Sequence, residues 1–148
     1  MAEFVPLLAP GIHRMGEANL QHLAVTAFPA SARRPLLFTN FEHWLNVLRS
    51  TGAAGRVWLD GSFLTAKPEP TDIDLVVLPE WQMSPSSADQ QKIAHLFDKA
   101  VAKAQYGLDV YVVDVRGQNA VEMASYWRGW FGFCRDGLTA KGIAEVGI

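Results

Sequence analysis

The sequence is poor in cysteine: Cys134 is the one cysteine among 148 residues. A single cysteine excludes an intramolecular disulfide and a cysteine-rich metal site, and it suits a reducing compartment. No stretch reaches the roughly 20 apolar residues that a membrane span needs. Residues 1–16 lack a basic region followed by an uninterrupted apolar run, so we expect no signal peptide. These absences predict a soluble, cytoplasmic protein without a membrane partner.

An excess of charge of one sign is also missing. Lysine and arginine number 13 against 15 acidic residues, which leaves a formal net charge of −2. Such a chain lacks the generally basic surface that coats nucleic acid, although a local basic patch remains compatible with it. The histidines show no metal-ligand spacing: they are His13, His22, His43 and His95.

Repeats, low-complexity tracts and linkers are absent as well. Hydrophobic residues make up 49% of the chain and charged residues 19%, which is ordinary for a compact globular protein. We therefore predict one domain over residues 1–148, with residues 1–30 as an N-terminal extension that packs on it.

The hydrophobic pattern predicts a small α/β protein in which strands alternate with helices. The predicted strands are "RVWLD" (56–60), "DIDLVVL" (72–78) and "LDVYVVDV" (108–115), with a short strand near the C-terminus. The predicted helices are a weak one around residues 20–27, one from 39 to about 51, one from 87 to 106 and one from 118 to about 130.

Capping signals bound two of these helices. Thr39 and Glu42 have capping-box spacing, and so have Ser87 and Gln90. Gly107 suits the left-handed position after the last turn of the second of these helices. The apolar residues of that helix are expected to face the core, as one continuous stripe: Ile93, Leu96, Phe97, Ala100, Val101 and Ala104.

Asp72 and Asp74 carry the first sign of chemistry. Residues two apart in a strand project from the same face, so these carboxylates lie together. They repel, and one tends to take a proton unless a cation neutralises them. Mg²⁺ is the natural cation, since it binds one or two carboxylates together with phosphate oxygens. A third acid belongs on a neighbouring strand; Asp109 is favoured, and Asp114 is the alternative on the opposite face.

Gly61 and Ser62 lie upstream, at a strand-to-loop corner. Glycine allows close backbone approach there, and free N–H groups with a hydroxyl can cradle a phosphate. Lys67 in the following loop either reaches a phosphate or is a solvated loop lysine. Arg135 and Lys141 either add phosphate contacts or belong to an ordinary turn.

Four further residues receive structural interpretations. Asp60 is interpreted as a structural residue, and Cys134 has no activating partner. Trp127 and Trp130 are better explained as core residues at helical spacing than as a platform for a base or an RNA acceptor.

The segment "LDGSFLTAKPEPTDIDLVV" (59–77) resembles the signature of the DNA-polymerase-β-like nucleotidyltransferase superfamily. That signature is hydrophobic-Gly-Ser, about ten residues, then Asp-hydrophobic-Asp-hydrophobic. Together with "GIH" (11–13) and "YWRGWFGFCRDGLTAKGI" (126–143), it is similar to a family of small bacterial proteins of that superfamily. Thr71 departs from that family, which often carries asparagine there.

The resemblance implies a nucleotidyltransferase fold: a small mixed sheet flanked by helices. It implies that Gly61 and Ser62 contact a nucleoside triphosphate, that Asp72 and Asp74 bind Mg²⁺ or Mn²⁺, and that Asp109 completes a two-metal site.

The implied reaction moves a nucleoside monophosphate to a hydroxyl of a protein, an RNA such as tRNA, or a small molecule, with release of pyrophosphate. Small members of the superfamily imply a toxin–antitoxin or phage-defence module with a cognate partner protein. The alternative is an inactive module that binds nucleotide or RNA, or an antitoxin that acts by contact.

Overall fold

The computed structural model describes residues 4–80, 86–113, 120–132 and 140–148. Within them the strands form a five-stranded sheet of order β1-β5-β2-β3-β4. The strands are β1 (Gly11–Arg14), β2 (Gly55–Asp60), β3 (Ile73–Pro79), β4 (Leu108–Val112) and β5 (Gly142–Gly147). The pairs β1–β5 and β3–β4 are parallel, whereas β2 is antiparallel to β3 and β5. The predicted mixed sheet flanked by helices is therefore confirmed.

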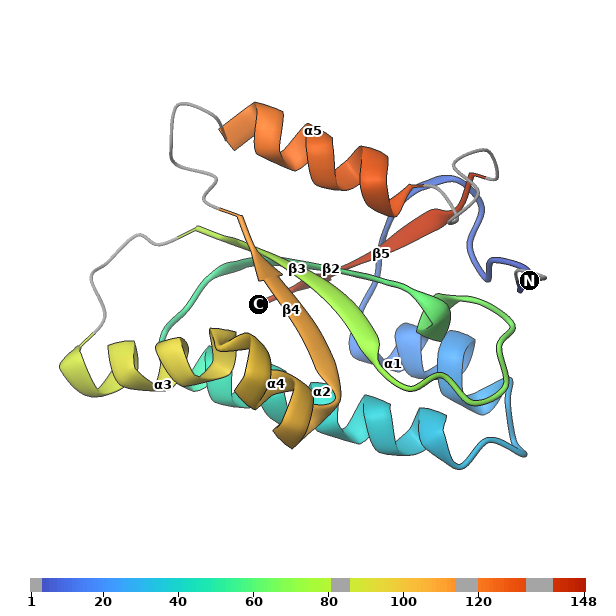
Figure 1. Ribbon diagram of the computed structural model, residues 1–148, viewed down its shortest axis with the longest axis horizontal. Helices are drawn as coiled ribbons and strands as arrows, with labels where there is room; N and C mark the ends of the chain where they lie inside the picture. The colour runs from blue at the N-terminus through green and yellow to red at the C-terminus, as the bar shows by residue number, and fades with distance from the viewer. Residues whose placement is uncertain (1–3, 81–85, 114–119, 133–139) are drawn as a thin grey trace.

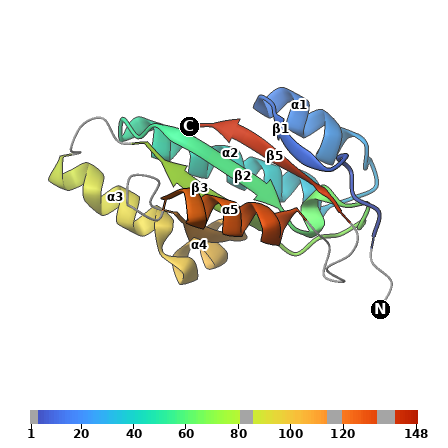
Figure 2. The same cartoon turned by 90° about the horizontal axis from the view of Figure 1, so that it is seen from above.

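Helices cover both faces of this sheet (Figures 1 and 2). The helices are α1 (Glu17–Gln21), the π-helix η1 (His22–Thr26), α2 (Arg33–Ser50), the 3-10 turn η2 (Ser62–Leu64), α3 (Ser87–Phe97), α4 (Lys99–Tyr106) and α5 (Ala120–Phe131). Helices α1 to α4 lie on one face and α5 on the other. In the part of the chain that the structure describes, no helix is long and apolar enough to cross a membrane.

Each face has its own hydrophobic cluster. The larger cluster packs α2 and its neighbours against the sheet, and it includes Leu20 and Ala24 from the N-terminal segment. The smaller cluster lies under α5: Trp58, Val76, Leu78, Val113 and Ile143. Along their strands, Asp60 lies two residues from Trp58 and Asp74 two residues from Val76, so the aspartates share the face of this smaller cluster, which α5 partly covers.

The predicted start of the second helix is wrong. Helix α2 begins at Arg33, six residues before Thr39, and the proposed Thr39–Glu42 capping box lies inside it. Pro35 lies inside α2, but it occupies the first turn, where a backbone N–H has no intrahelical acceptor. A proline there does not prevent the helix from forming.

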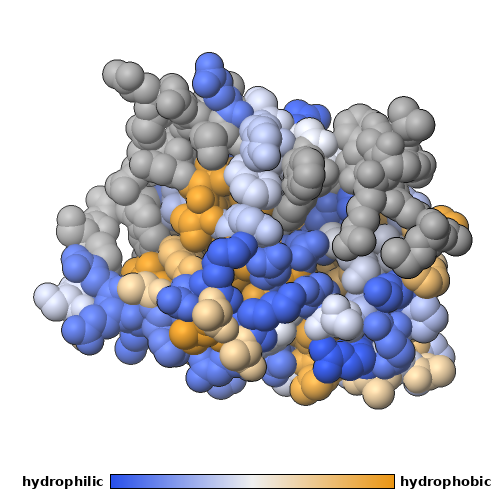
Figure 3. Space-filling model, in the orientation of Figure 1, coloured by the Kyte–Doolittle hydropathy of each residue, from blue (hydrophilic) through white to orange (hydrophobic). Residues whose placement is uncertain are grey.

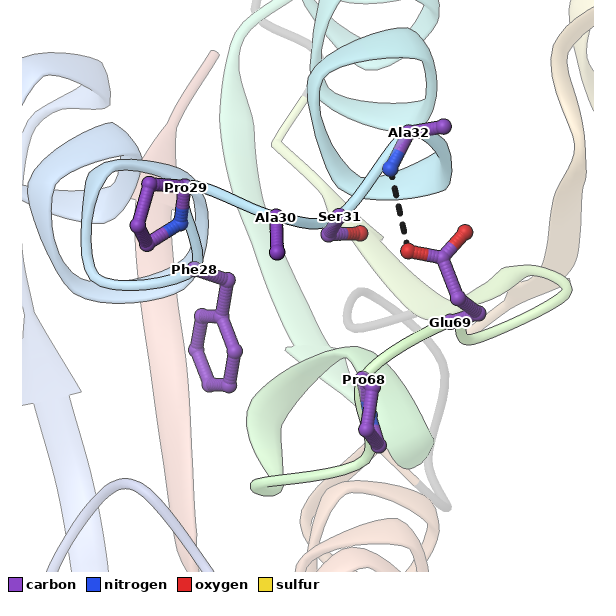
Figure 4. Close-up of a pocket in the computed structure, with 7 residues that line it drawn as sticks. All are labelled: Phe28, Pro29, Ala30, Ser31, Ala32, Pro68 and Glu69. Carbon is purple, nitrogen blue, oxygen red and sulfur yellow. Dashed lines mark hydrogen bonds between the residues drawn. The ribbon is translucent and has the colours of Figure 1, made fainter.

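A residue from the motif loop caps α2 instead. The Glu69 carboxylate accepts a hydrogen bond from the backbone N–H of Ala32 at 3.0 Å (Figure 4). It accepts a second one from the backbone N–H of Arg33 at 3.2 Å. Negative charge at this end also suits the helix dipole. A shallow pocket lies beside the cap, lined by Phe28, Pro29, Ala30, Ser31, Ala32, Pro68 and Glu69. No aspartate lines that pocket.

The single helix predicted over 87–106 is also wrong, because the chain breaks at Asp98. Asp98 has extended backbone (ψ 122°), and its side chain accepts from Val101 N–H as the N-cap of α4. The break shifts the buried stripe: Ala102 is buried, whereas Ala100 and Ala104 are exposed.

The ends of this region differ in how well they were predicted. At the start of α3 the capping pair is Ser86 and Asp89, one residue before the predicted Ser87–Gln90 pair. Gly107 does have the predicted left-handed backbone, with φ 69°. The helices expected around residues 20–27 and 118–130 and the strand near the C-terminus are present.

Arg34 joins α2 to the loop that follows β2. Its side chain is fully buried, and the guanidinium donates to the backbone carbonyls of Ala24, Phe63, Thr65 and Lys67, at 2.5 to 2.9 Å. Burial lowers the pKa of Arg34 to about 10, so the group stays charged at neutral pH. A buried guanidinium needs such acceptors, and they hold the loop in place.

Candidate functional site

Three aspartates lie side by side across neighbouring strands. Asp60 ends β2 and pairs in register with Asp74 of β3, and Asp74 pairs in register with Asp109 of β4. Directly opposed residues of paired strands share a face, so the three carboxylates project from the same side of the sheet. Asp72 precedes Asp74 by two residues and joins them. The structure thus brings together the three predicted acids, Asp72, Asp74 and Asp109, and adds Asp60.

Asp74 lies at the centre of this carboxylate cluster (Asp60, Asp72, Asp74 and Asp109). Burial, together with the charges of Asp72 and Asp109, raises its pKa to about 6, against the opposing effect of Lys141 and Lys103. Among the described residues, none makes a hydrogen bond or ion pair with the Asp74 carboxylate. Asp74 is the group of the cluster that most needs a cation.

Asp60, interpreted from the sequence as a structural residue, lies within the carboxylate cluster beside Asp74. It is 1% exposed, and the Lys141 ammonium lies 3.3 Å from its Oδ2 atom. Burial raises the pKa of Asp60 to about 7, while Lys141 and the Gly61 N–H lower it. Lys141, predicted to contact phosphate, is therefore brought to the edge of the cluster as the partner of Asp60.

Two lysines that sequence reasoning missed neutralise Asp72 and Asp109. Lys103 forms an ion pair with Asp72, and Lys99 Nζ lies 3.0 Å from Asp109 Oδ1. The Tyr111 hydroxyl donates to Asp109 Oδ2 at 3.2 Å. The sequence did carry a signal for these lysines. They are four residues apart, and so on one face of a helix, and that helix leads directly into the strand of Asp109.

Gly61 brings the backbone of the Gly-Ser motif against the carboxylate of Asp74. Its φ is +81°, a region that favours glycine, and a Cβ atom there would lie 2.4 Å from Asp74 Oδ2. Ser62 follows as the first residue of η2 and is half-buried. The two halves of the motif, separated by nine residues in sequence, are thus in direct contact in space.

The remaining predicted residues are Lys67 and Trp127, which the structure describes, and several that lie outside the described residues. Lys67 donates its backbone N–H to Thr65 Oγ1 and its carbonyl accepts from Arg34, while its ammonium makes no ion pair with any described residue. Trp127 packs against Tyr111, with 4.7 Å between the ring centroids, which supports its predicted packing role. Outside the described residues lie Arg135, Asp114 and Cys134, as does the side chain of Trp130.

The chemistry of the cluster fits a divalent cation, although its side chains are not arranged around one. Over the described ranges, no group of three His, Cys, Asp or Glu side chains is arranged to hold a metal ion. Ammonium groups pair with Asp72 and Asp109 instead, and no described side chain pairs directly with Asp74. Carboxylate oxygens are the donors that Mg²⁺ and Mn²⁺ prefer, so Asp72, Asp74 and Asp109 suit such an ion once the lysines withdraw.

Fold and site together define a mixed α/β protein with a lysine-neutralised carboxylate cluster at one end of its sheet. The chain belongs to a family of unknown function, DUF6932, whose profile matches residues 2–147. No curated protein and no solved structure matches the chain. The nucleotidyltransferase resemblance therefore stays a prediction.

Gly61→Ala tests the close contact between the two motif halves, and Gly52→Ala is its matched control. Both glycines have positive φ, at +81° and +77°, but only open space surrounds the Cβ position of Gly52. We expect Gly52→Ala to cost about 1 kcal/mol from backbone strain. Gly61→Ala should cost about 2 kcal/mol more, because the added methyl collides with Asp74. Urea unfolding measures both, and equal losses would contradict the contact.

Asp74→Asn tests the repulsion within the cluster. The folded-state pKa of Asp74, about 6, lies above its ordinary value of 3.8, so the folded chain holds this proton more tightly than the unfolded chain. The wild type therefore loses stability as the pH rises from about 4 to about 6, and the variant lacks this loss. At pH 7 without divalent cations, Asp74→Asn should be more stable by about 1–3 kcal/mol.

The measurement is the free energy of unfolding from urea titrations between pH 4 and pH 8. Glu122→Gln, at an exposed position on α5, is the control for removal of a carboxylate. An Asp74→Asn curve that runs parallel to the wild type over this range would show that burial and the neighbouring carboxylates do not raise the pKa of Asp74.

Proposed function

We propose that the chain is a metal-dependent nucleotidyltransferase. It transfers a nucleoside monophosphate from a nucleoside triphosphate to a hydroxyl of a protein, an RNA or a small molecule. The observation that carries this proposal is the cluster of Asp72, Asp74 and Asp109 on one face, in contact with the glycine turn of Gly61. The resemblance of residues 59–77 to the nucleotidyltransferase signature supports it.

Asp72, Asp74 and Asp109 are the residues that would hold Mg²⁺ or Mn²⁺. When bound, such an ion supplies charge neutralisation at the phosphates and lowers the pKa of an acceptor hydroxyl. Gly61 places no side chain between this turn and Asp74, so that phosphate oxygens can approach the turn and the Ser62 hydroxyl. Lys67, Lys141 and Arg135 are proposed phosphate contacts.

The reaction balances without a further reactant. The acceptor oxygen attacks the α-phosphorus, the bond from that phosphorus to the bridging oxygen breaks, and pyrophosphate leaves. The acceptor proton passes to Asp109, which lies on the edge strand β4, or to solvent. A role in a toxin–antitoxin or phage-defence module, with a cognate partner protein, is proposed on the resemblance alone.

One observation favours a second candidate, a module that binds nucleotide or RNA without turnover, or an antitoxin that acts by contact. Lys99 and Lys103 already neutralise two of the three proposed metal ligands. A cluster with permanent internal cations can recognise a nucleotide through its lysines and never assemble a metal site.

Label transfer separates the two candidates. The protein is incubated with each α-³²P-labelled nucleoside triphosphate, Mg²⁺ or Mn²⁺, and a cell extract, and parallel samples are digested with protease or nuclease. A transferase gives covalent label, and Asp74→Asn should lower its yield at least about 100-fold, because charge stabilisation of the transition state is lost. Glu122→Gln should label like the wild type.

The digests identify the acceptor: protease-sensitive label indicates a protein, and nuclease-sensitive label indicates an RNA. Absence of label with every nucleotide, while a nucleotide still raises the melting temperature, would reject the transferase and favour the binding module. Equal labelling by wild type and Asp74→Asn would reject the assigned site.

A further inference from the structure

Helix α4 presents two lysines to the carboxylate cluster, one turn apart. Lys103 pairs with Asp72, and Lys99 pairs with Asp109. Lys99 Nζ also lies 3.4 Å above the ring of Tyr111, whose hydroxyl donates to the same aspartate. Each lysine therefore holds a carboxylate that the proposed function assigns to a metal ion.

These ion pairs are exposed on the lysine side. The side chains of Lys99 and Lys103 are 55% and 54% exposed, against 27% and 21% for Asp109 and Asp72. An ammonium group has three N–H donors, so each lysine keeps donors that face solvent. Ion pairs of this kind contribute little to stability and exchange readily. Figure 3 shows mainly hydrophilic side chains over α3 and α4 on this side of the molecule.

The helix itself is firmly placed, so the lysines move only through their side chains. Asp98 caps its first turn, and Gly107 ends it in the left-handed conformation. Ala102, between the two lysines, is fully buried in the larger core cluster. A flexible four-carbon stem on a fixed backbone lets each ammonium leave its carboxylate and remain beside the site.

We propose that Lys99 and Lys103 exchange partners: they neutralise Asp109 and Asp72 in the cation-free chain, yield them to a divalent cation, and then bind the phosphates of a nucleoside triphosphate. This inference rests on the proposed function and deepens it. It assigns the polyphosphate to α4, where neither the sequence motifs nor the family description places any role.

The charges support this exchange. Asp72, Asp74 and Asp109 against two lysines leave the group with a net charge of −1, because no cation among the described residues forms an ion pair with Asp74. One divalent cation changes this net charge from −1 to +1. The Lys141–Asp60 ion pair adds no net charge. A site that becomes positive only when the cation enters recruits a polyphosphate at that stage and not before.

The exchange predicts opposite effects on two affinities. Without a lysine, Mn²⁺ alone competes with one cation fewer, so Lys103→Met and Lys99→Met should bind it about 3- to 10-fold more tightly. The same variants should bind the Mn²⁺ complex of α,β-methylene-ATP about 10-fold more weakly, since a charge-assisted contact to phosphate is lost. Titration calorimetry measures both, and Lys103→Arg should restore nucleotide binding.

Lys92→Met, at an exposed position of α3, is the matched control and should change neither affinity. A merely structural role for the lysines would move both affinities in the same direction, and that result would overturn the exchange. So would lysine variants that bind like the wild type while Asp74→Asn abolishes Mn²⁺ binding. Binding of Mn²⁺ and nucleotide that Asp74→Asn leaves unchanged would instead overturn the proposed function.

Discussion

Repulsion between carboxylates in register is the constraint on which this site depends. Strand pairing forces Asp60, Asp74 and Asp109 onto one face of three adjacent strands. Lysines from α4 and from the segment before β5 reduce that repulsion, because they form ion pairs with the aspartates. Such an arrangement costs folding free energy, and a protein retains it where the carboxylates have a function.

The Gly61–Thr71 loop is the second part of the site, and α2 holds it. Buried Arg34 donates to carbonyls along this loop, and Arg33 donates to the carbonyls of Pro70 and Thr71. In the opposite direction, Glu69 of the loop accepts from the first backbone N–H groups of α2. These bonds place the glycine turn against Asp74 without any residue of the cluster taking part. The scaffold and the charged groups are therefore separate, so single substitutions can alter one and spare the other.

Local periodicity was sufficient to predict part of this site. Alternation along a strand placed Asp72 and Asp74 together, and the position of Asp109 at the start of the next strand aligned it with them. Asp60 was interpreted as a structural residue because its place beside Asp74 depends on the antiparallel register of β2, which no local pattern encodes. Lys99 and Lys103 escaped notice for a similar reason: the break at Asp98 turns α4 so that they meet β4. The fold class followed from pattern, whereas tertiary contacts decided helix boundaries.

The proposal that Asp72, Asp74 and Asp109 hold a divalent cation for a nucleotide substrate is tested by anomalous diffraction at the manganese edge. The crystals are grown with Mn²⁺ and α,β-methylene-ATP. We expect a manganese peak within about 2.5 Å of carboxylate oxygens of Asp72 and Asp74, with phosphate oxygens bound to the same ion. Nucleotide bound elsewhere, or bound here with Lys99 and Lys103 still on their aspartates and no manganese peak, would contradict it.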